Sequence, residues 1–174
     1  MKILIKRNPN GDTRTAPQNI TFKQFQEAND MHIKDVRMVM YELSEMLQIQ
    51  GRGHDWTKKT EEALFFSDFL ATKNKGVDFV NNEWYQLHIH NEKHHPLSYC
   101  HDDITLLDII EMVVDCVCAG KARSGEIRNL EVNEEILKLA LNNTVKLIDS
   151  MTIIEEGFGV DIPQLLEVLE SDKF

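Results

Sequence analysis

The sequence predicts an all-α, single-domain helical bundle with a short N-terminal strand or arm. From residue 21 onward, apolar residues recur at helical spacing. A chain of 174 residues with 42% hydrophobic content is also long enough to bury one core. We therefore expect an arm over residues 1–19 and a helical domain over residues 20–174.

The expected elements run from one strand to a series of helices. Ile3 to Ile5 is a strand-like run, and Thr21 with Gln24 three residues later is a capping box that opens the first helix. Pro96 limits one later helix, and Gly120 is expected to stop another. The helices are expected at about residues 21–29, 30–48, 56–71, 81–94, 105–119, 133–151 and 161–171.

Composition excludes several classes of protein. No apolar run approaches the length of a membrane span, and the N-terminus has too short an apolar stretch for a signal peptide. The three cysteines form no recognised disulfide framework, so a cytoplasmic location is expected. The formal charge of −10 disfavours nonspecific nucleic-acid binding, although a bound cation could still attract a small phosphorylated molecule.

The adjacent pair His54-Asp55 is the strongest indication of chemistry. An imidazole and a carboxylate can hold one divalent cation while further ligands arrive from His32 and Asp115. His32 lies on the inward stripe of its expected helix, so we expect it to be buried or half-buried. Each residue has a structural alternative: Asp55 could cap the next helix, and His32 could be a core histidine with polar partners. Asp115 lies deep in an apolar helix, where capping does not explain a carboxylate.

A second group of histidines adds candidate ligands. On the helix expected to end near Pro96, His88, Asn91 and His95 fall along one broad face, with His94 beside them, although His94 and His95 could also form an exposed helix end. Glu111 either faces solvent or supports a ligand, whereas Asp108 belongs to a capping box with Thr105. Imidazole and carboxylate ligands favour Mn, Fe, Co, Ni or Zn, with one metal ion or two.

In this order and helical context, the sequence resembles the HD-domain superfamily of metal-dependent phosphohydrolases. The resemblance covers roughly residues 30 to 120 and rests on His32, the string His54-Asp55-Trp56-Thr57-Lys58, and Asp115. The segment from Trp84 to Pro96 is similar to the extra histidines of members that hold two metals. The chain also resembles small phage and bacterial HD-like proteins of unassigned function. Two departures are the short interval from His32 to His54 and the missing tail after the paired histidines.

The resemblance implies a helical bundle of the HD-domain type and a function. His32, His54, Asp55 and Asp115 would bind a divalent metal, with His88, His94 and His95 as candidate ligands of a second. A metal-activated water would hydrolyse a nucleotide or another small phosphate ester, as a phosphomonoesterase or phosphodiesterase, with Asp55 and Lys58 as catalytic residues. Lys58, Arg52 and Arg123 would contact the substrate.

Two alternatives stay open. The first is a non-catalytic HD-like binding or regulatory protein, and the second is a metal that only stabilises the fold. The C-terminal amphipathic helices could also support a homodimer.

Overall fold

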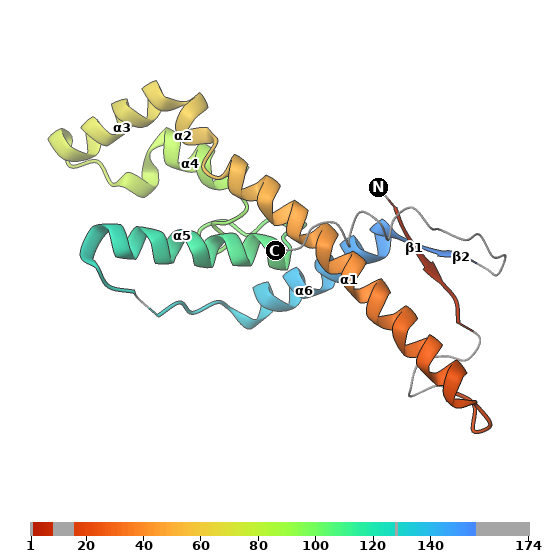
Figure 1. The fold of residues 1–174 in the computed structure, drawn as a ribbon. Helices are drawn as coiled ribbons and strands as arrows, with labels where there is room; N and C mark the ends of the chain where they lie inside the picture. The colour runs from red at the N-terminus through yellow and green to blue at the C-terminus, as the bar shows by residue number, and fades with distance from the viewer. Residues whose placement is uncertain (1, 9–15, 128, 156–174) are drawn as a thin grey trace. The chain divides into compact units, whose positions relative to one another are not determined.

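A computed structural model of the chain describes residues 2–8, 16–127 and 129–155 (Figure 1). These residues are mostly helical, as expected for an all-α protein. The chain divides into two compact units, one from residues 1–38 with 151–174 and one from residues 39–150. The expected helix at residues 161–171 lies outside the described residues, and the expected boundary near residue 19 stays a prediction.

The first unit contains a two-stranded parallel sheet. β1 (Ile3–Lys6) pairs with β2 (Thr152–Glu155), with Ile3 opposite Thr152 and Lys6 opposite Glu155 (Figure 1). The strand expected at the N-terminus is confirmed. Its partner was not predicted, although the run Thr152-Ile153-Ile154 is β-branched and suits a strand.

The longest helix, α1 (Phe22–Gly53), begins in the first unit and continues into the second. The capping box is confirmed, because Thr21 N donates to Gln24 Oε1 at 3.0 Å and Gln24 N to Thr21 Oγ1 at 3.3 Å. The prediction of two separate helices is wrong: residues 22–50 contain no glycine or proline to interrupt one helix. The expected burial of His32 is also wrong, since this side chain is exposed.

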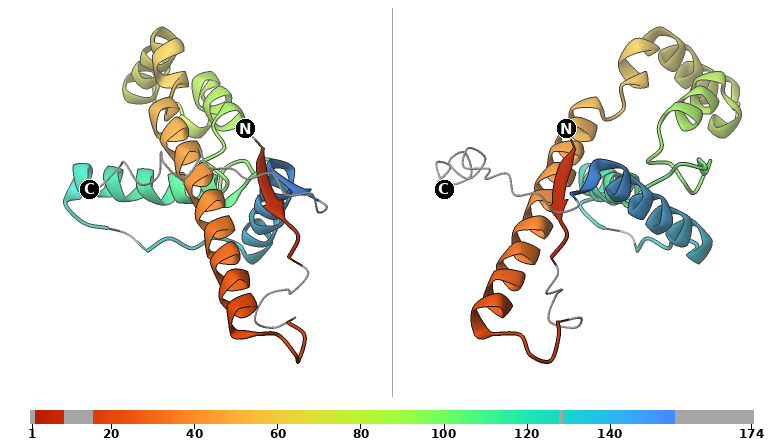
Figure 2. Two further views of the ribbon diagram at one scale, coloured as in Figure 1. Left: turned by 45° about the vertical axis from the view of Figure 1, so that its right-hand side comes forward. Right: turned by 90° about the vertical axis from the view of Figure 1, so that its right-hand side faces the viewer.

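The second unit holds the remaining helices. α2 (Thr57–Thr60), α3 (Glu62–Lys75) and α4 (Glu83–Asn91) pack against one another, and a short 3₁₀ helix, η1 (Phe79–Asn81), lies between α3 and α4 along the chain (Figure 2). The helix expected at residues 56–71 is divided in two at Glu61, and its second part continues to Lys75 and ends at Gly76, whose φ of 67° is left-handed. Two longer helices follow, α5 (Leu106–Ser124) and α6 (Glu134–Met151).

α4 is shorter than expected. It ends at Asn91 because Glu92 adopts an extended conformation with φ −113° and ψ 105°. His94 and His95 therefore lie in the loop after the helix, and the prediction that His95 shares a helix face with His88, with His94 beside it, is wrong. The loop folds back on itself through a bond from His95 N to Glu92 O at 3.4 Å.

α5 is longer than expected. Its capping box is confirmed, with Thr105 N and Oγ1 both donating to Asp108 Oδ2 at 2.7 Å. The helix passes through Gly120 and ends at Gly125, whose φ of 76° is left-handed. Gly120 has a different role: a Cβ there would lie 2.7 Å from Glu126 O, so the returning loop needs a residue without a side chain.

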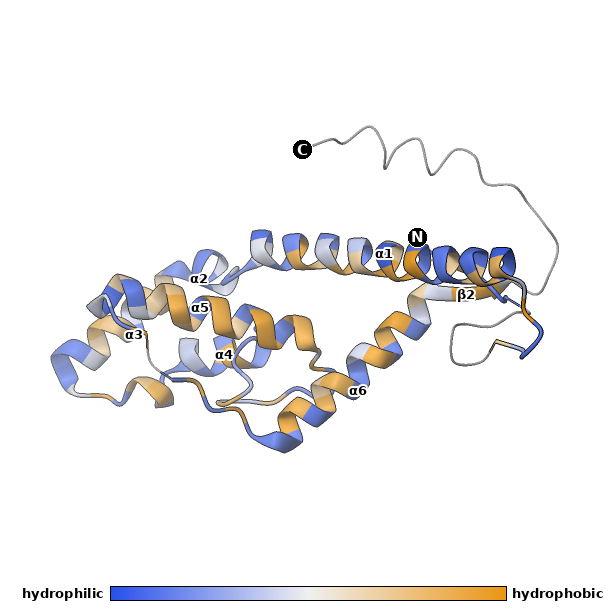
Figure 3. Cartoon of the chain, turned by 60° about the horizontal axis from the view of Figure 1, so that its bottom comes forward, coloured by the Kyte–Doolittle hydropathy of each residue, from blue (hydrophilic) through white to orange (hydrophobic). Residues whose placement is uncertain are grey.

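The main apolar core of the second unit lies where α5 meets α6. Ile104, Ile109, Met112 and Ala140 are buried together, and Figure 3 shows the concentration of apolar residues along α5. Thr144 in α6 accepts a hydrogen bond from the backbone N–H of Leu106 at 2.8 Å. This contact ties α6 to the first turn of α5 and so anchors the helix that carries Glu111 and Asp115.

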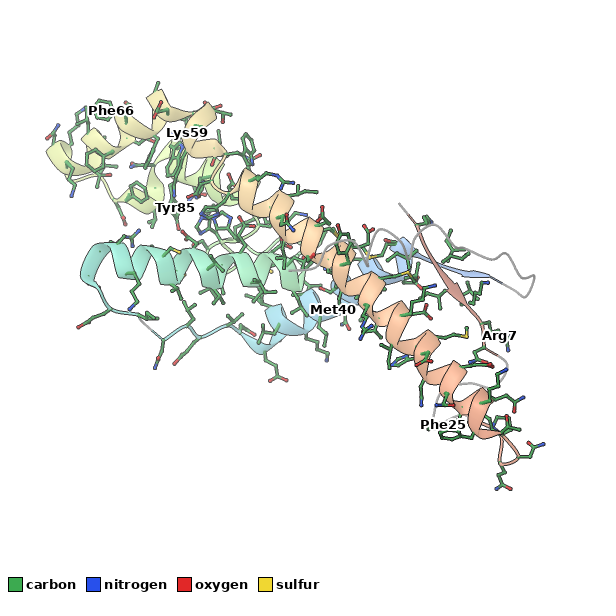
Figure 4. All side chains as sticks on the ribbon, viewed as in Figure 1. Arg7, Phe25, Met40, Lys59, Phe66 and Tyr85 are labelled. Atoms are coloured by element: carbon green, nitrogen blue, oxygen red, sulfur yellow. The ribbon has the colours of Figure 1, made fainter. Side chains whose placement is uncertain are left out.

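Large apolar side chains also lie on the surface. Phe66, labelled in Figure 4, is 60% exposed, and α1 exposes Met40 and Tyr41. Within the described part of the chain, no helix combines the length and the apolar character that crossing a bilayer requires.

Candidate metal centre

His54 and Asp55 form the turn between α1 and α2. Asp55 has a φ of 57°, the left-handed conformation that aspartate tolerates better than most residues other than glycine. Such backbone strain concentrates at functional sites. The alternative that Asp55 caps α2 is wrong, because the N-cap position is Trp56, whose own side chain makes no capping hydrogen bond.

The turn lies against histidines and carboxylates from three other segments. α4 supplies His88, the loop after it supplies His94 and His95, and α5 supplies Glu111 and Asp115. Helix, turn and loop thus contribute to one cluster, and the cluster lies wholly within the second unit.

Asp55 is at the centre of the cluster. Its Oδ2 lies 3.2 Å from His54 Nε2 and also pairs with the ammonium of Lys58. Its Oδ1 lies 3.4 Å from His88 Nε2 and 3.5 Å from His94 Nε2. Three imidazoles therefore direct the same ring nitrogen, Nε2, at one carboxylate.

Glu111 contacts the other ring nitrogen, Nδ1, of two of these imidazoles, His54 and His94. Its Oε1 lies 2.9 Å from His54 Nδ1 and 3.2 Å from His94 Nδ1. A carboxylate oxygen accepts hydrogen bonds, so both Nδ1 atoms carry the hydrogen and donate it. A carboxylate behind a histidine in this way orients the other ring nitrogen as a metal ligand. Of the two roles open to Glu111 in the sequence, supporting a ligand fits this geometry.

Two buried atoms at the centre make no hydrogen bond. They are Asp55 Oδ1 and His94 Nε2, which face each other at 3.5 Å, beyond the usual length of an N–H···O bond. His94 is 1% exposed. Buried polar atoms are nearly always bonded, and an unmet pair costs free energy. A cation between them would satisfy both.

The surroundings shift the pKa values of these groups in opposite directions. Burial alone would lower the pKa of His94, but attraction to Asp55 and Glu111 raises it to about 9. Burial would raise the pKa of Asp55 and of Glu111, but their histidine partners, and Lys58 for Asp55, hold both below the ordinary range. Without metal, the His94 imidazolium therefore supplies the positive charge between the two carboxylates.

His88 and His95 behave differently. Burial, together with the positive charge of neighbouring histidines, lowers the pKa of each to about 4. Both are neutral at physiological pH, which is the form that binds metals.

The donor atoms fall into overlapping groups whose ligand atoms lie within 4.8 Å of one another. The buried donor group consists of Asp55, His88, His94 and His95. The half-buried donor group consists of His54, Asp55 and Asp115. Asp55 belongs to both, and nitrogen with carboxylate oxygen suits Mn, Fe, Co, Ni or Zn. In a third combination, His54 with His94 and Glu111, the Glu111 carboxylate already lies against Nδ1 of both rings.

Most of the predicted site residues come together, and some do not. His54, Asp55, Asp115, His88, His94, His95 and Lys58 form the cluster. His32 is absent from every such group among the described residues, and its role as a ligand stays a prediction. Arg52, in the last turn of α1, and Arg123, in the last turn of α5, are exposed, and neither forms an ion pair with the cluster in the described part of the chain.

Sequence reasoning missed Glu92 and the hydroxyl of Thr57. Both are buried beside His88, at 5% and 0% exposure. Thr57 stood inside the recognised string, but Glu92 lies in a charged stretch that resembles an exposed helix end, so no pattern in the sequence marked it.

The cluster lies inside a segment of the chain that matches a protein family. The model of the "Family of unknown function (DUF5662)" matches residues 21–156. The chain belongs to this DUF5662 family. The match contains every residue of the cluster and omits β1. No curated protein and no solved structure matches the chain.

Proposed function

We propose that this DUF5662 protein is a metal-dependent phosphohydrolase whose two donor groups bind divalent ions on either side of Asp55. The observation that carries the proposal is the pair of buried atoms Asp55 Oδ1 and His94 Nε2, which make no hydrogen bond. Around this pair, His88 and His95 are neutral, and His54 is hydrogen-bonded to Glu111. The order of histidines and aspartates along the chain, which resembles that of the HD-domain superfamily, supports the same conclusion.

The exposure of the cluster supports a substrate site on one side. The side chains of His54 and Asp115 are 31% and 28% exposed, whereas His88 and His94 are buried. The half-buried donor group is therefore open to solvent, and a small phosphate ester can reach it. The buried donor group is closed, and its ion would mainly hold Asp55 and stabilise the site.

The residues have distinct roles in the proposed reaction. A bound divalent ion would supply an activated water and polarise a phosphoryl oxygen. Asp55 and Asp115 are the carboxylates placed to accept the proton of the attacking water. The Lys58 ammonium, 39% exposed and beside Asp55, is placed to offset charge on the phosphoryl group. Arg52 and Arg123 are proposed substrate contacts on the basis of the sequence alone.

Metal binding is the first test. The protein is stripped with a chelator, dialysed and titrated with Co²⁺, and we expect one or two bound equivalents. Asp55→Asn should abolish binding while keeping the fold, because asparagine also tolerates the left-handed conformation. Asp102→Asn, a change at an exposed aspartate, is the matched control. Undiminished metal binding by Asp55→Asn would refute the site.

Turnover is the second test. We expect phosphate release from p-nitrophenyl phosphate, its bis-ester, or a panel of nucleotides in the presence of Mn²⁺, Fe²⁺, Co²⁺, Ni²⁺ or Zn²⁺. Activity should disappear in Asp55→Asn and fall in Lys58→Ala. Metal binding without turnover of any substrate would instead favour a non-catalytic binding or regulatory protein.

A further inference from the structure

A chain of hydrogen bonds leads from His88 away from the donor groups. Thr57 Oγ1 lies 2.6 Å from His88 Nδ1 and 3.0 Å from Glu92 Oε1. The same carboxylate oxygen also accepts the backbone N–H of Thr57 at 3.1 Å. All three residues are at most 5% exposed, so water does not complete this network from outside.

The direction of these bonds follows from the number of hydrogens. A backbone N–H can only donate, so Glu92 Oε1 is an acceptor. The Thr57 hydroxyl has a single hydrogen. If it pointed at His88, two acceptor oxygens would face each other at 3.0 Å in a buried site, which is unfavourable. The hydroxyl therefore donates to Glu92, and its oxygen accepts a hydrogen from His88 Nδ1.

We propose that Thr57 and Glu92 are positioning residues that hold His88 in the Nδ1–H tautomer, so that its Nε2 lone pair is directed at the buried donor group. This inference rests on the proposed metal centre, because the oriented atom is one of its candidate ligands. A histidine ligand is commonly fixed by the hydrogen bond that its other ring nitrogen makes. Here a hydroxyl placed between imidazole and carboxylate makes that bond.

The ring of His88 is also fixed in orientation. It stacks on Trp84 with centroids 4.7 Å apart and planes 15° apart, and Trp84 stacks in turn on Phe65 at 3.8 Å. Stacking prevents the ring from turning, and the Thr57 bond decides which nitrogen carries the hydrogen. Without metal, His95 must then donate across the 2.7 Å that separates its Nε2 from His88 Nε2.

The tautomer can be measured directly on the metal-free protein. Nitrogen-15 NMR of histidine side chains distinguishes Nδ1–H from Nε2–H, and the His88 signals are identified by their loss in His88→Gln. We expect the Nδ1–H form in the unchanged protein. Finding His88 in the Nε2–H form there would overturn the inference, whatever the variants do.

Variants at Thr57 separate the hydroxyl from the shape of the side chain. Thr57→Val keeps the shape and removes the hydroxyl, whereas Thr57→Ser keeps the hydroxyl and loses a methyl group. We expect Thr57→Val to lose the exclusive Nδ1–H form and to bind Co²⁺ about 10–100-fold more weakly. Thr57→Ser should retain the tautomer and most of the affinity. Equal affinity for Co²⁺ in the Val and Ser variants would contradict a positioning role for the hydrogen-bond chain from His88 through Thr57 to Glu92.

The two proposals fail in different ways. If the unchanged protein binds no metal, the metal centre is refuted, and with it the positioning role of Thr57 and Glu92. If the protein binds metal but His88 carries its hydrogen on Nε2 in the metal-free state, only the positioning role of Thr57 and Glu92 is refuted.

Discussion

Binding of a divalent ion to the buried donor group should release about one proton at neutral pH. His94 has a pKa raised to about 9 between Asp55 and Glu111, so it is protonated at pH 7 and must lose its proton to become a ligand. His88 and His95, with pKa values lowered to about 4, are already neutral and release none. The proton therefore comes from one identified residue.

The size of the effect follows from the distance between pH and pKa. At pH 7, two units below the pKa of His94, about one molecule in a hundred carries the neutral imidazole. The apparent affinity for metal is thus about 100-fold below its limit at high pH. It should rise about tenfold per pH unit between pH 6.5 and 8.

Isothermal titration calorimetry with Co²⁺ in two buffers of different ionisation enthalpy counts the released protons. Glu111→Gln removes the carboxylate 3.2 Å from His94 Nδ1, so it should lower the pKa of His94 and reduce the release. Glu131→Gln, at an exposed position, is the matched control. An affinity that stays constant from pH 6.5 to 8, with no proton released, would refute the assignment of positive charge to His94.

Three further predictions concern stability, measured as urea unfolding of the metal-free protein. The folded pKa of His94, about 9, exceeds the ordinary 6.5, so stability should fall as the pH rises from 6.5 to 9. The fall should be at most roughly 1.4 kcal/mol per pH unit, and His94→Gln should abolish it. Below pH 6.5 stability should instead fall as the pH falls, because His88 and His95, whose folded pKa values are lowered to about 4, are protonated more readily in the unfolded chain. A stability independent of pH would contradict both statements. Gly120→Ala should destabilise the protein by about 1–3 kcal/mol, since the new Cβ would meet a backbone oxygen. Gly51→Ala, with open space around it, should stabilise the protein by up to about 1 kcal/mol. Equal effects of the two changes would show that the contact at Gly120 is absent. Thr105→Ala should cost about 1 kcal/mol through loss of the α5 capping box and Thr105→Ser much less, and an equal loss in both would point to packing instead.

The lengths of the helices show where sequence reasoning reaches its limit. Both capping boxes were recognisable because they depend on residues three positions apart. The end of α4 could not be recognised, because Glu92 has an extended conformation and accepts hydrogen bonds from Thr57, 35 residues away. Gly120 looked like a helix end because glycine is common just past one, and only its contact with the backbone of Glu126 shows that it serves close packing instead.

For the candidate site, the types of residue could be read from the sequence, and their partners could not. His54-Asp55 and Asp115 were recognisable from adjacency and from a carboxylate in an apolar helix. His32 was chosen on helical periodicity, which describes one face of a helix and cannot tell whether anything covers that face; the residue is exposed. Glu92 was missed because its partner lies on another helix.

The sequence by itself determined the helical class, the capped helix starts and most of the residue types in the candidate metal centre, because each depends on neighbours within a few positions. Only the tertiary structure decided that Asp55 occupies a left-handed turn, that three Nε2 atoms face it, and that Glu111, Thr57 and Glu92 stand behind the rings. Apart from the turn itself and the adjacent pair His54-Asp55, these contacts join residues far apart in the sequence, such as Thr57 and His88, 31 positions apart, and His54 and Glu111, 57 positions apart. The packing of separate segments sets them.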